Sequence, residues 1–326
     1  MIVRWGLESL GGVLRAVGII RPLLVSTERW RELELPVVAR YHGVLPHADR
    51  LGVEAALEQA QATRADGLVA LGGGSAIDSA KAVSAETALP VVSVPTTYAG
   101  AEWTAYFGVR DAESGTKGGG AGARLAAIVY EPKLTLQLPT AVSAGTALNA
   151  LAHCAEALYV RNRNDESDRH ALAGARLIDA ALPAVLADGG DLESRTRLLE
   201  GACEAGAALA GSGLALGHAM AQALGGRYGF PHGALNAICL PPALRFNEPV
   251  VPDAIAWLGE ALGVDDPVAR VEELARLGGF GRLRDLSVPR EELGEVAEAT
   301  AQRPAMRLNP RPASPEQIQE LLDSVW

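Results

Sequence analysis

Polar residues in the second half of the chain have types and spacing that could do chemistry. Three of the six histidines lie in apolar, helix-like surroundings: His153, His218 and His232. Asn149 and His153 are four residues apart, as are His218 and Gln222, so each pair shares one helix face. Three convergent imidazoles can bind a metal such as zinc, or an anionic substrate without metal, and a single histidine can also be a satisfied core residue. The pattern predicts one polar cleft and leaves its ligand open.

A glycine-rich turn is the second candidate for chemistry. The segment 69–81, VALGGGSAIDSAK, runs from an expected strand through Gly72, Gly73 and Gly74 into an expected helix, for which Ser75 would be the N-cap. The first N–H groups of a helix attract anions, and glycines let a pyrophosphate approach closely. A tight turn that needs positive φ is the alternative. The spacing is neither GxGxxG nor GxxxxGKS/T, so it is not an ordinary Rossmann or P-loop fingerprint.

A second polar turn, PTTYAGAE at 95–102, follows the next expected strand. Ligands of open α/β sheets bind at the carboxyl ends of the strands. The hydroxyls of Thr96 and Thr97 could hold a phosphate or a carboxamide there, although a plain Ser/Thr turn explains them equally well. Tyr98 could donate a proton, or it could be a packed aromatic.

Two kinds of scaffold must position these residues. In the first part of the chain, short apolar runs alternate with Ala/Glu/Arg-rich helical stretches, which predicts parallel strands joined by crossover helices. The expected strands are 22–26, 67–71, 91–95 and 125–130, and the expected helices are 51–65 and 75–85. We therefore predict an α/β dinucleotide-binding domain, Rossmann-like and with a parallel sheet, at residues 1–140.

Residues 141–326 read as an all-α domain that carries the substrate or metal site, because long Ala/Leu/Glu/Arg stretches replace the β-branched runs. The expected helices are 141–161, 167–187, 192–211, 213–224, 234–246, 252–262, 267–277, 290–300 and 314–325. The glycines at 118–122 predict a mobile loop in the first domain.

Composition limits the partners. Acidic residues outnumber basic ones, 39 to 29, and the net charge of −10 argues against binding nucleic acid or an anionic membrane. The uncharged stretch 205–226 is better explained as a buried helix than as a membrane span. The N-terminus carries no signal-peptide pattern, and Cys154, Cys203 and Cys239 share no metal-type spacing. We expect a cytoplasmic protein that acts on a small molecule.

Five segments together resemble the iron-containing alcohol dehydrogenase family. They occur in the family's order and at similar spacing over nearly the whole chain: GGGSAIDSAK at 72–81, PTTYAGAE at 95–102, NALAHCAEALYV at 149–160, GHAMAQALGG at 217–226 and PHGALNAICLP at 231–241. PTTYAG, followed by EPKLTLQLP and NALAHCAEALY, is most similar to the maleylacetate reductase branch.

The resemblance implies a dehydroquinate synthase-like fold with the active cleft between two domains. It implies cofactor binding by the two polar turns and by the end of the first expected strand: Gly72, Gly73, Gly74, Ser75, Asp78, Thr96, Thr97 and Thr27. No acidic residue stands at Ser26-Thr27 to bind the ribose 2′-hydroxyl, so either NADH or NADPH is permitted. The catalytic groups would be His153, His218, His232, Tyr98 and Gln222.

Two positions depart from the metal-dependent relatives, in which one Asp and three His bind the metal. Asn149 stands at the Asp position, and Gln222 stands where a further His usually lies beside the nicotinamide. A neutral amide removes one formal charge and is a poorer ligand than a carboxylate for a first-row metal. Fe²⁺ or Zn²⁺ could still bind three imidazoles, but we expect a site with weak or no metal dependence.

The expected activity is hydride transfer from NAD(P)H to an enone or keto acid, of the maleylacetate to 3-oxoadipate type. Arg245 and Lys117 are candidates to bind substrate carboxylates, and the resemblance suggests a homodimer. One alternative is a biosynthetic member that acts on a quinone-like or polyketide intermediate, or that catalyses a non-redox lyase or cyclase reaction. A second alternative is a non-catalytic nucleotide-binding protein.

Overall fold

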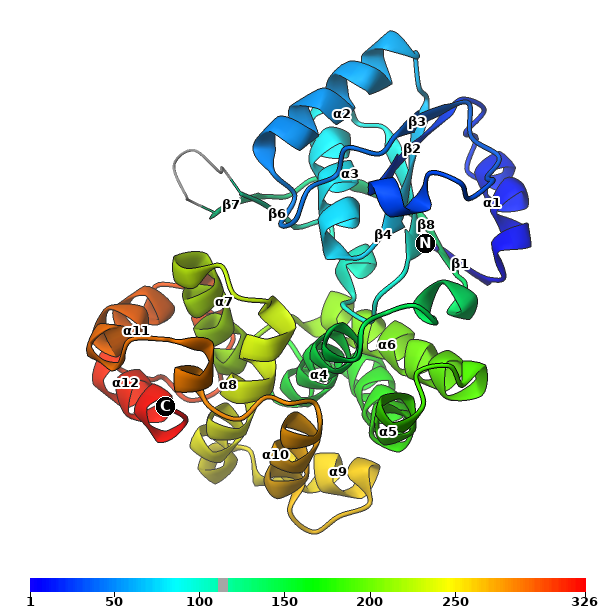
Figure 1. Cartoon of the computed structure of the whole chain (residues 1–326). Helices are drawn as coiled ribbons and strands as arrows, with labels where there is room; N and C mark the ends of the chain where they lie inside the picture. The colour runs from blue at the N-terminus through cyan, green and yellow to red at the C-terminus, as the bar shows by residue number, and fades with distance from the viewer. Residues whose placement is uncertain (111–116) are drawn as a thin grey trace. The chain divides into compact units, whose positions relative to one another are not determined.

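A computed structural model gives the structure of residues 1–110 and 117–326. It divides into two compact units, Met1–Thr135 and Leu136–Trp326 (Figure 1). The division falls five residues before the boundary expected from the change in sequence texture.

The first unit is built on a parallel sheet. Its six strands lie in the order β1-β8-β5-β4-β2-β3, and every neighbouring pair is parallel. The strands are β1 (Ile2–Trp5), β2 (Pro22–Ser26), β3 (Ala39–Tyr41), β4 (Gly67–Gly72), β5 (Pro90–Pro95) and β8 (Arg124–Tyr130). The helices of this unit are α1 (Leu10–Ala16), α2 (Arg50–Ala62) and α3 (Gly74–Thr87).

Helices cover both faces of this sheet, which is why its strands are apolar without alternation. Leu23 and Val25 of β2 lie in one core with Ile77 of α3, whereas Leu24 of β2 lies in a second core with Leu14 of α1. Figure 1 shows α1 on one side of the sheet and α2 and α3 on the other. The central strands are therefore covered on both faces up to their carboxyl ends.

The expected strands of the central sheet are confirmed as β2, β4, β5 and β8. The edge strands β1 and β3 were not expected, because they are short and only partly buried. The prediction of a mobile loop at 118–122 is wrong over its first part: β7 (Lys117–Gly120) pairs antiparallel with β6 (Phe107–Arg110). A β-carbon at Gly120 would lie 2.4 Å from Cζ of Phe107, so the glycine makes room for that ring.

The second unit is helical, as expected. Its helices are α4 (Thr140–Ala157), α5 (Asp165–Ala187), α6 (Leu192–Ser212), α7 (Leu216–Tyr228), α8 (His232–Asn247), α9 (Pro252–Leu262), α10 (Pro267–Leu277), α11 (Leu293–Ala301) and α12 (Pro315–Ser324). A short 3₁₀ turn, η8 (Pro304–Arg307), lies against α7. Helix α4 contacts α5, α6 and α8, and its residues from Leu148 to Ala157 are all buried.

The uncharged stretch 205–226 is not one helix. It is divided between α6 and α7, and Gly213, at φ +113°, ends α6. Within the described residues, α5 alone is long and apolar enough to cross a bilayer, and it lies against α4, α6 and α9.

Helices α4 and α8 cross at two glycines. A β-carbon on Gly233, the second residue of α8, would lie 2.3 Å from the backbone carbon and oxygen of Gly145. No side chain fits between backbones at this separation. Because Gly233 follows His232, this crossing fixes where the His232 ring begins.

We expect Gly233→Ala to lower the melting temperature, because its methyl group would push α8 away from α4. Overpacking of this kind costs about 1–3 kcal/mol. Thermal unfolding followed by circular dichroism measures the change. Gly145→Ala is the matched control: its β-carbon would meet its nearest neighbour at 3.4 Å, and alanine favours the helix by up to about 1 kcal/mol. Equal losses of melting temperature for both variants would contradict the conclusion that a β-carbon is excluded at Gly233 but tolerated at Gly145.

Candidate active site

The glycine loop lies at the carboxyl edge of the sheet. Gly72 ends β4 opposite Pro95 of β5, and its carbonyl accepts a hydrogen bond from the N–H of Thr96. A β-carbon on Gly73 would lie 2.8 Å from Cγ2 of Thr97, so this residue must be small. The two polar turns are therefore in contact beside the start of α3, which no side chain caps. This arrangement suits a phosphate group.

Ser75 is not the N-cap that the sequence suggested. Helix α3 begins at Gly74 with Gly73 as its N-cap, and no side chain caps it. The Ser75 hydroxyl instead accepts a hydrogen bond from the N–H of His47 at 2.9 Å. This leaves the first N–H groups of α3 without a side-chain acceptor, which is what an anion-binding terminus requires.

Asp78 is held by contacts within the first unit. One carboxylate oxygen lies 2.9 Å from Nζ of Lys81, and the other accepts the N–H of Gly108 at 3.1 Å. The Lys81 ammonium is buried and also donates to backbone carbonyls that include the carbonyl of Ala101 at 2.7 Å. The geometry gives Asp78 a structural contact to β6, and its role in cofactor binding stays a prediction.

The other predicted site residues of the first unit differ in their exposure to solvent. Thr27 follows β2 and is half-buried, and Thr97 is half-buried as well. Thr96 is buried, and Tyr98 has no exposed surface. The suggested role of Tyr98 as a proton donor therefore concerns a hydroxyl within the core, and it stays a prediction.

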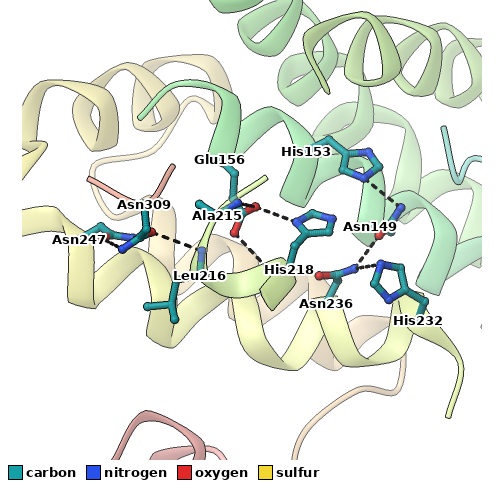
Figure 2. A network of polar contacts seen from close by, with 10 residues as sticks. All are labelled: Asn149, His153, Glu156, Ala215, Leu216, His218, His232, Asn236, Asn247 and Asn309. Atoms are coloured by element: carbon teal, nitrogen blue, oxygen red, sulfur yellow. Dashed lines mark hydrogen bonds and ion pairs between the residues drawn. The ribbon is translucent and has the colours of Figure 1, made fainter. Parts of the chain in front are cut away.

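Three imidazole rings come together in the second unit (Figure 2). His153 of α4 and His218 of α7 stack with ring centroids 4.7 Å apart and planes 13° apart. His232, at the start of α8, lies with its centroid 5.8 Å from that of His218. The rings of the three histidines therefore converge, as the sequence predicted, and the cleft that they would share stays a prediction.

Glu156 fixes the orientation of His218. Its carboxylate is fully buried and accepts hydrogen bonds from Nδ1 of His218 at 2.8 Å and from the N–H groups of His218 and Ala215 at 3.1 and 2.6 Å. These bonds join α4 to the first turn of α7. Nε2 of His218 is then aimed into the cluster, where it is buried and has no partner among the described residues.

Two amides complete the cluster. Nδ2 of Asn236 donates to Oδ1 of Asn149 at 2.6 Å and lies 3.0 Å from Nε2 of His232. Nδ2 of Asn149 makes a long contact of 3.4 Å to Nε2 of His153 (Figure 2). An amide NH₂ can only donate, so both imidazole nitrogens are acceptors. Nδ1 of His153 carries the proton in that tautomer, and it has no partner among the residues of known placement.

Burial sets the charge of His153. The pKa of His153 lies well below its ordinary value, because burial disfavours the cation and because His218 and His232 would add positive charge nearby. His153 and His218 are both almost fully buried, whereas His232 and Gln222 are half-buried. The cluster therefore has a closed end at the first pair and an accessible end at the second.

The sequence analysis missed Glu156 and Asn236. Both carry a local signal, since Glu156 lies three residues after His153 and Asn236 lies four residues after His232 on their helices. The suggested carboxylate-binding role of Arg245 is not favoured, because this side chain forms an ion pair with Glu272 at 2.6 Å. Lys117 begins β7, and its side chain lies outside the described part of the structure.

The donor set does not fit a resident divalent metal. Nε2 of His153 and of His232 each face an amide NH₂, and the Asn149 oxygen that replaces a carboxylate already accepts from Asn236. Within residues 1–110 and 117–326, no group of three or more His, Cys, Asp or Glu side chains has an arrangement that could hold a metal ion. Ligation would require both amides to turn away.

A parallel sheet with a glycine-rich loop at its carboxyl edge, followed by a helical unit with a polar cluster, is an arrangement that suits a dinucleotide-dependent oxidoreductase. Residues 7–130 match the model of the iron-containing alcohol dehydrogenases, and residues 143–326 match the C-terminal model of that family. The chain belongs to the iron-containing alcohol dehydrogenase family.

Three similar proteins are maleylacetate reductases. The enzyme of Pseudomonas knackmussii is 37% identical over 92% of this chain and 89% of that protein, and the enzyme of Burkholderia cepacia is 36% identical over 98% and 93%. The crystal structure of maleylacetate reductase from Rhizobium sp. strain MTP-10005 superposes with a TM-score of 0.91 at 31% identity, covering 100% of this chain and 95% of that one.

These relatives make the chain an NAD(P)H-dependent reductase that resembles maleylacetate reductase. The family binds NAD(P) and is an iron-containing one. The three relatives are reductases, and this chain matches almost their full length. They therefore do not favour the non-redox alternative or the non-catalytic alternative.

We expect Glu156→Gln to lower the free energy of unfolding by about 3 kcal/mol, because the amide replaces one acceptor oxygen with an NH₂ group that faces buried donors. Chemical denaturation measures this loss. Glu204→Gln is the matched control, since Glu204 pairs with His170 at 2.5 Å but is about one third exposed, and we expect less than about 1 kcal/mol there. Similar losses for the two variants would show that the burial of Glu156 does not increase its contribution to the free energy of unfolding.

Proposed function

We propose that this chain reduces maleylacetate, or a closely related enone dicarboxylate, with NADH or NADPH and without a resident divalent metal. The observation that carries the proposal is the pair of buried imidazole nitrogens, Nδ1 of His153 and Nε2 of His218, which have no protein partner in the described structure. Buried polar atoms are seldom left unpaired, so these two call for a polar group from a ligand.

The reaction is a conjugate reduction. Hydride from the nicotinamide forms a C–H bond at the alkene carbon β to the ketone, and the alkene electron pair moves toward the carbonyl to give an enolate. A proton then adds at the carbon α to the ketone. In the balanced reaction, NAD(P)H, a proton and maleylacetate (4-oxohex-2-enedioate) give NAD(P)⁺ and 3-oxoadipate. Negative charge develops on one oxygen, and donors fixed toward that oxygen lower the barrier.

His153 is suited to stabilise that oxygen as a neutral donor. Its depressed pKa keeps the ring neutral near pH 7, and the contact from Asn149 to Nε2 leaves the proton on Nδ1. A neutral N–H donor needs no proton exchange with solvent. Asn149 would thus act on the tautomer of the imidazole, which an ionised carboxylate, having only acceptor oxygens, could not do in the same way.

His218 is suited to hold a proton beside the substrate. The Glu156 carboxylate accepts from its Nδ1 and holds the ring with Nε2 aimed into the cluster. A ring with a proton on each nitrogen would offer its Nε2–H as a second donor toward the developing enolate. Gln222 cannot exchange a proton, so the proton that reaches the α carbon would come from His218 or from water.

The cofactor would be held by the first unit. The proposal rests on the contact of the glycine loop with the Thr96–Thr97 turn and on the uncapped start of α3. Neither Ser26 nor Thr27 carries a charge that would repel a 2′-phosphate, which supports use of either cofactor. The homodimer and the cytoplasmic location stay predictions.

We expect the purified chain to oxidise NADH or NADPH when maleylacetate is added, followed by the absorbance of the reduced nicotinamide. His218→Gln should lower kcat by about 10²–10³-fold, since it removes one donor to the oxyanion. His170→Gln is the control, because this half-buried ring lies outside the cluster and pairs with Glu204. Product formation without net cofactor oxidation would contradict the proposed reduction.

We expect dialysis against a strong chelator to leave kcat within about twofold, and added Zn²⁺ or Fe²⁺ not to raise it, because the amides occupy the imidazole acceptors. Elemental analysis of freshly purified protein should give far less than one metal per chain. Asn149→Asp is the comparison, since it restores the acid and should raise the affinity for Zn²⁺ measured by calorimetry. Stoichiometric metal whose removal abolishes turnover would refute the proposed site.

A further inference from the structure

Among the residues that the structure describes, one arginine beside α7 has no carboxylate partner. Arg303, just before η8, is half-buried against α7, and its Nη2 donates to the backbone carbonyl of Gln222 at 3.3 Å. A β-carbon on Gly226 would lie 3.3 Å from the same nitrogen, so the missing side chain there leaves room for the guanidinium. Arg303 thus lies along the α7 face that carries Gln222 and Gly226.

The neighbouring arginine shows what a paired side chain looks like in this region. Arg227 forms ion pairs with Glu292 at 2.7 Å and Glu295 at 2.8 Å. Within the described ranges, Arg303 forms no ion pair, and the one hydrogen bond at 3.3 Å uses one of its five N–H donors. Its pKa is lowered by partial burial alone, with no acid nearby to offset the loss of water.

The position of Arg303 relates it to the imidazole cluster. His218, Gln222 and Gly226 follow one another at four-residue spacing on α7 and therefore share a face. Successive residues of this set are about 6 Å apart along the helix axis. Arg303 reaches the face one to two turns beyond His218, on the side where Gln222 is half-buried and the cluster is accessible. A short dicarboxylate with its ketone at His218 would extend over this distance.

We propose that Arg303 binds a terminal carboxylate of the substrate and makes this site selective for enone dicarboxylates over neutral enones. The inference rests on the function proposed above and names the residue that recognises the charged end. A guanidinium suits this task because its fixed fork matches the two oxygens of a carboxylate. Arg245 does not compete for the role, since Glu272 already binds it.

A purely structural role is the competing explanation. Arg303 also supports the last part of α7 by donating to Gln222, as cations near helix C-termini do. That role needs one donor and a positive charge, which lysine supplies. Carboxylate binding needs the planar fork, which lysine lacks, so Arg303→Lys separates the two explanations.

The test uses the full chain with saturating NADP⁺ and the unreactive dicarboxylate adipate as probe. Binding to the folded state raises the melting temperature, so the shift at several adipate concentrations gives an apparent Kd. Wild type, Arg303→Gln, Arg303→Lys and Arg307→Gln are compared. Arg307 is the matched control, because it is an exposed arginine of the adjoining η8 turn, and its replacement removes the same charge.

We expect Arg303→Gln to weaken adipate binding by about 10- to 100-fold, since a charge-assisted pair is lost. Arg303→Lys should keep the melting temperature of the free protein and still weaken adipate binding several-fold, while Arg307→Gln binds as wild type does. In turnover, Arg303→Gln should raise KM for the dicarboxylate much more than it lowers kcat, and it should leave the KM of a dimethyl ester unchanged.

Adipate binding that is equal in wild type and Arg303→Gln would overturn the assignment, and so would a wild type that binds no adipate. A loss of affinity in Arg307→Gln equal to that in Arg303→Gln would also overturn it, because the effect would then be one of net charge. Failure of the proposed reduction is distinguishable: maleylacetate would cause no NAD(P)H oxidation, while adipate binding would still depend on Arg303.

Discussion

The polar cluster of the second unit depends on one constraint: buried imidazole nitrogens need partners, and two amides, Asn149 and Asn236, supply them to His153 and His232. Asn149 both accepts from Asn236 and donates toward His153, so the two amides and two imidazoles form a connected network. A network of this kind fixes tautomers as well as positions. Everything proposed for the chemistry follows from which nitrogens remain unpaired once the amides are bonded.

The helices of the second unit are arranged so that this network can form. Glu156 joins α4 to the first turn of α7, and the glycine crossing holds the first turn of α8 against α4. One contact uses a buried charge and the other uses the absence of side chains. The first contact lies at the start of α7 and the second at the start of α8. Together they place the ring centroids of His218 and His232 5.8 Å apart, although the two residues belong to different helices.

Sequence reasoning was strongest where a local pattern carries the information. Residues 67–71 are apolar because both faces of their strand are covered, and the Asn149–His153 spacing places both on one face of α4. It failed where tertiary pairing decides. Gly118–Gly120 looked like a loop, yet pairing with β6 makes them a strand. Ser75 looked like a cap, although His47, distant in sequence, donates to its hydroxyl.

The same division applies to the site. Histidine spacing predicted the cluster, but the partners of each ring could not be read from spacing, because Glu156 reaches His218 across 62 positions and Asn236 reaches Asn149 across 87. Arg303 lies outside the α-helices, so no helical spacing in the sequence relates it to the histidines. Its importance comes from what is missing around it, which only a folded structure can show.

The graded burial of the cluster has a consequence for the order of events. His153 and His218 lie at the closed end, while His232 and Gln222 are half-buried. In a dicarboxylate the uncharged part is the central enone, so the enone loses less hydration than either carboxylate when it lies against the closed end. The gradient of burial would then select which part of the substrate lies beside the two buried imidazoles before any bond changes.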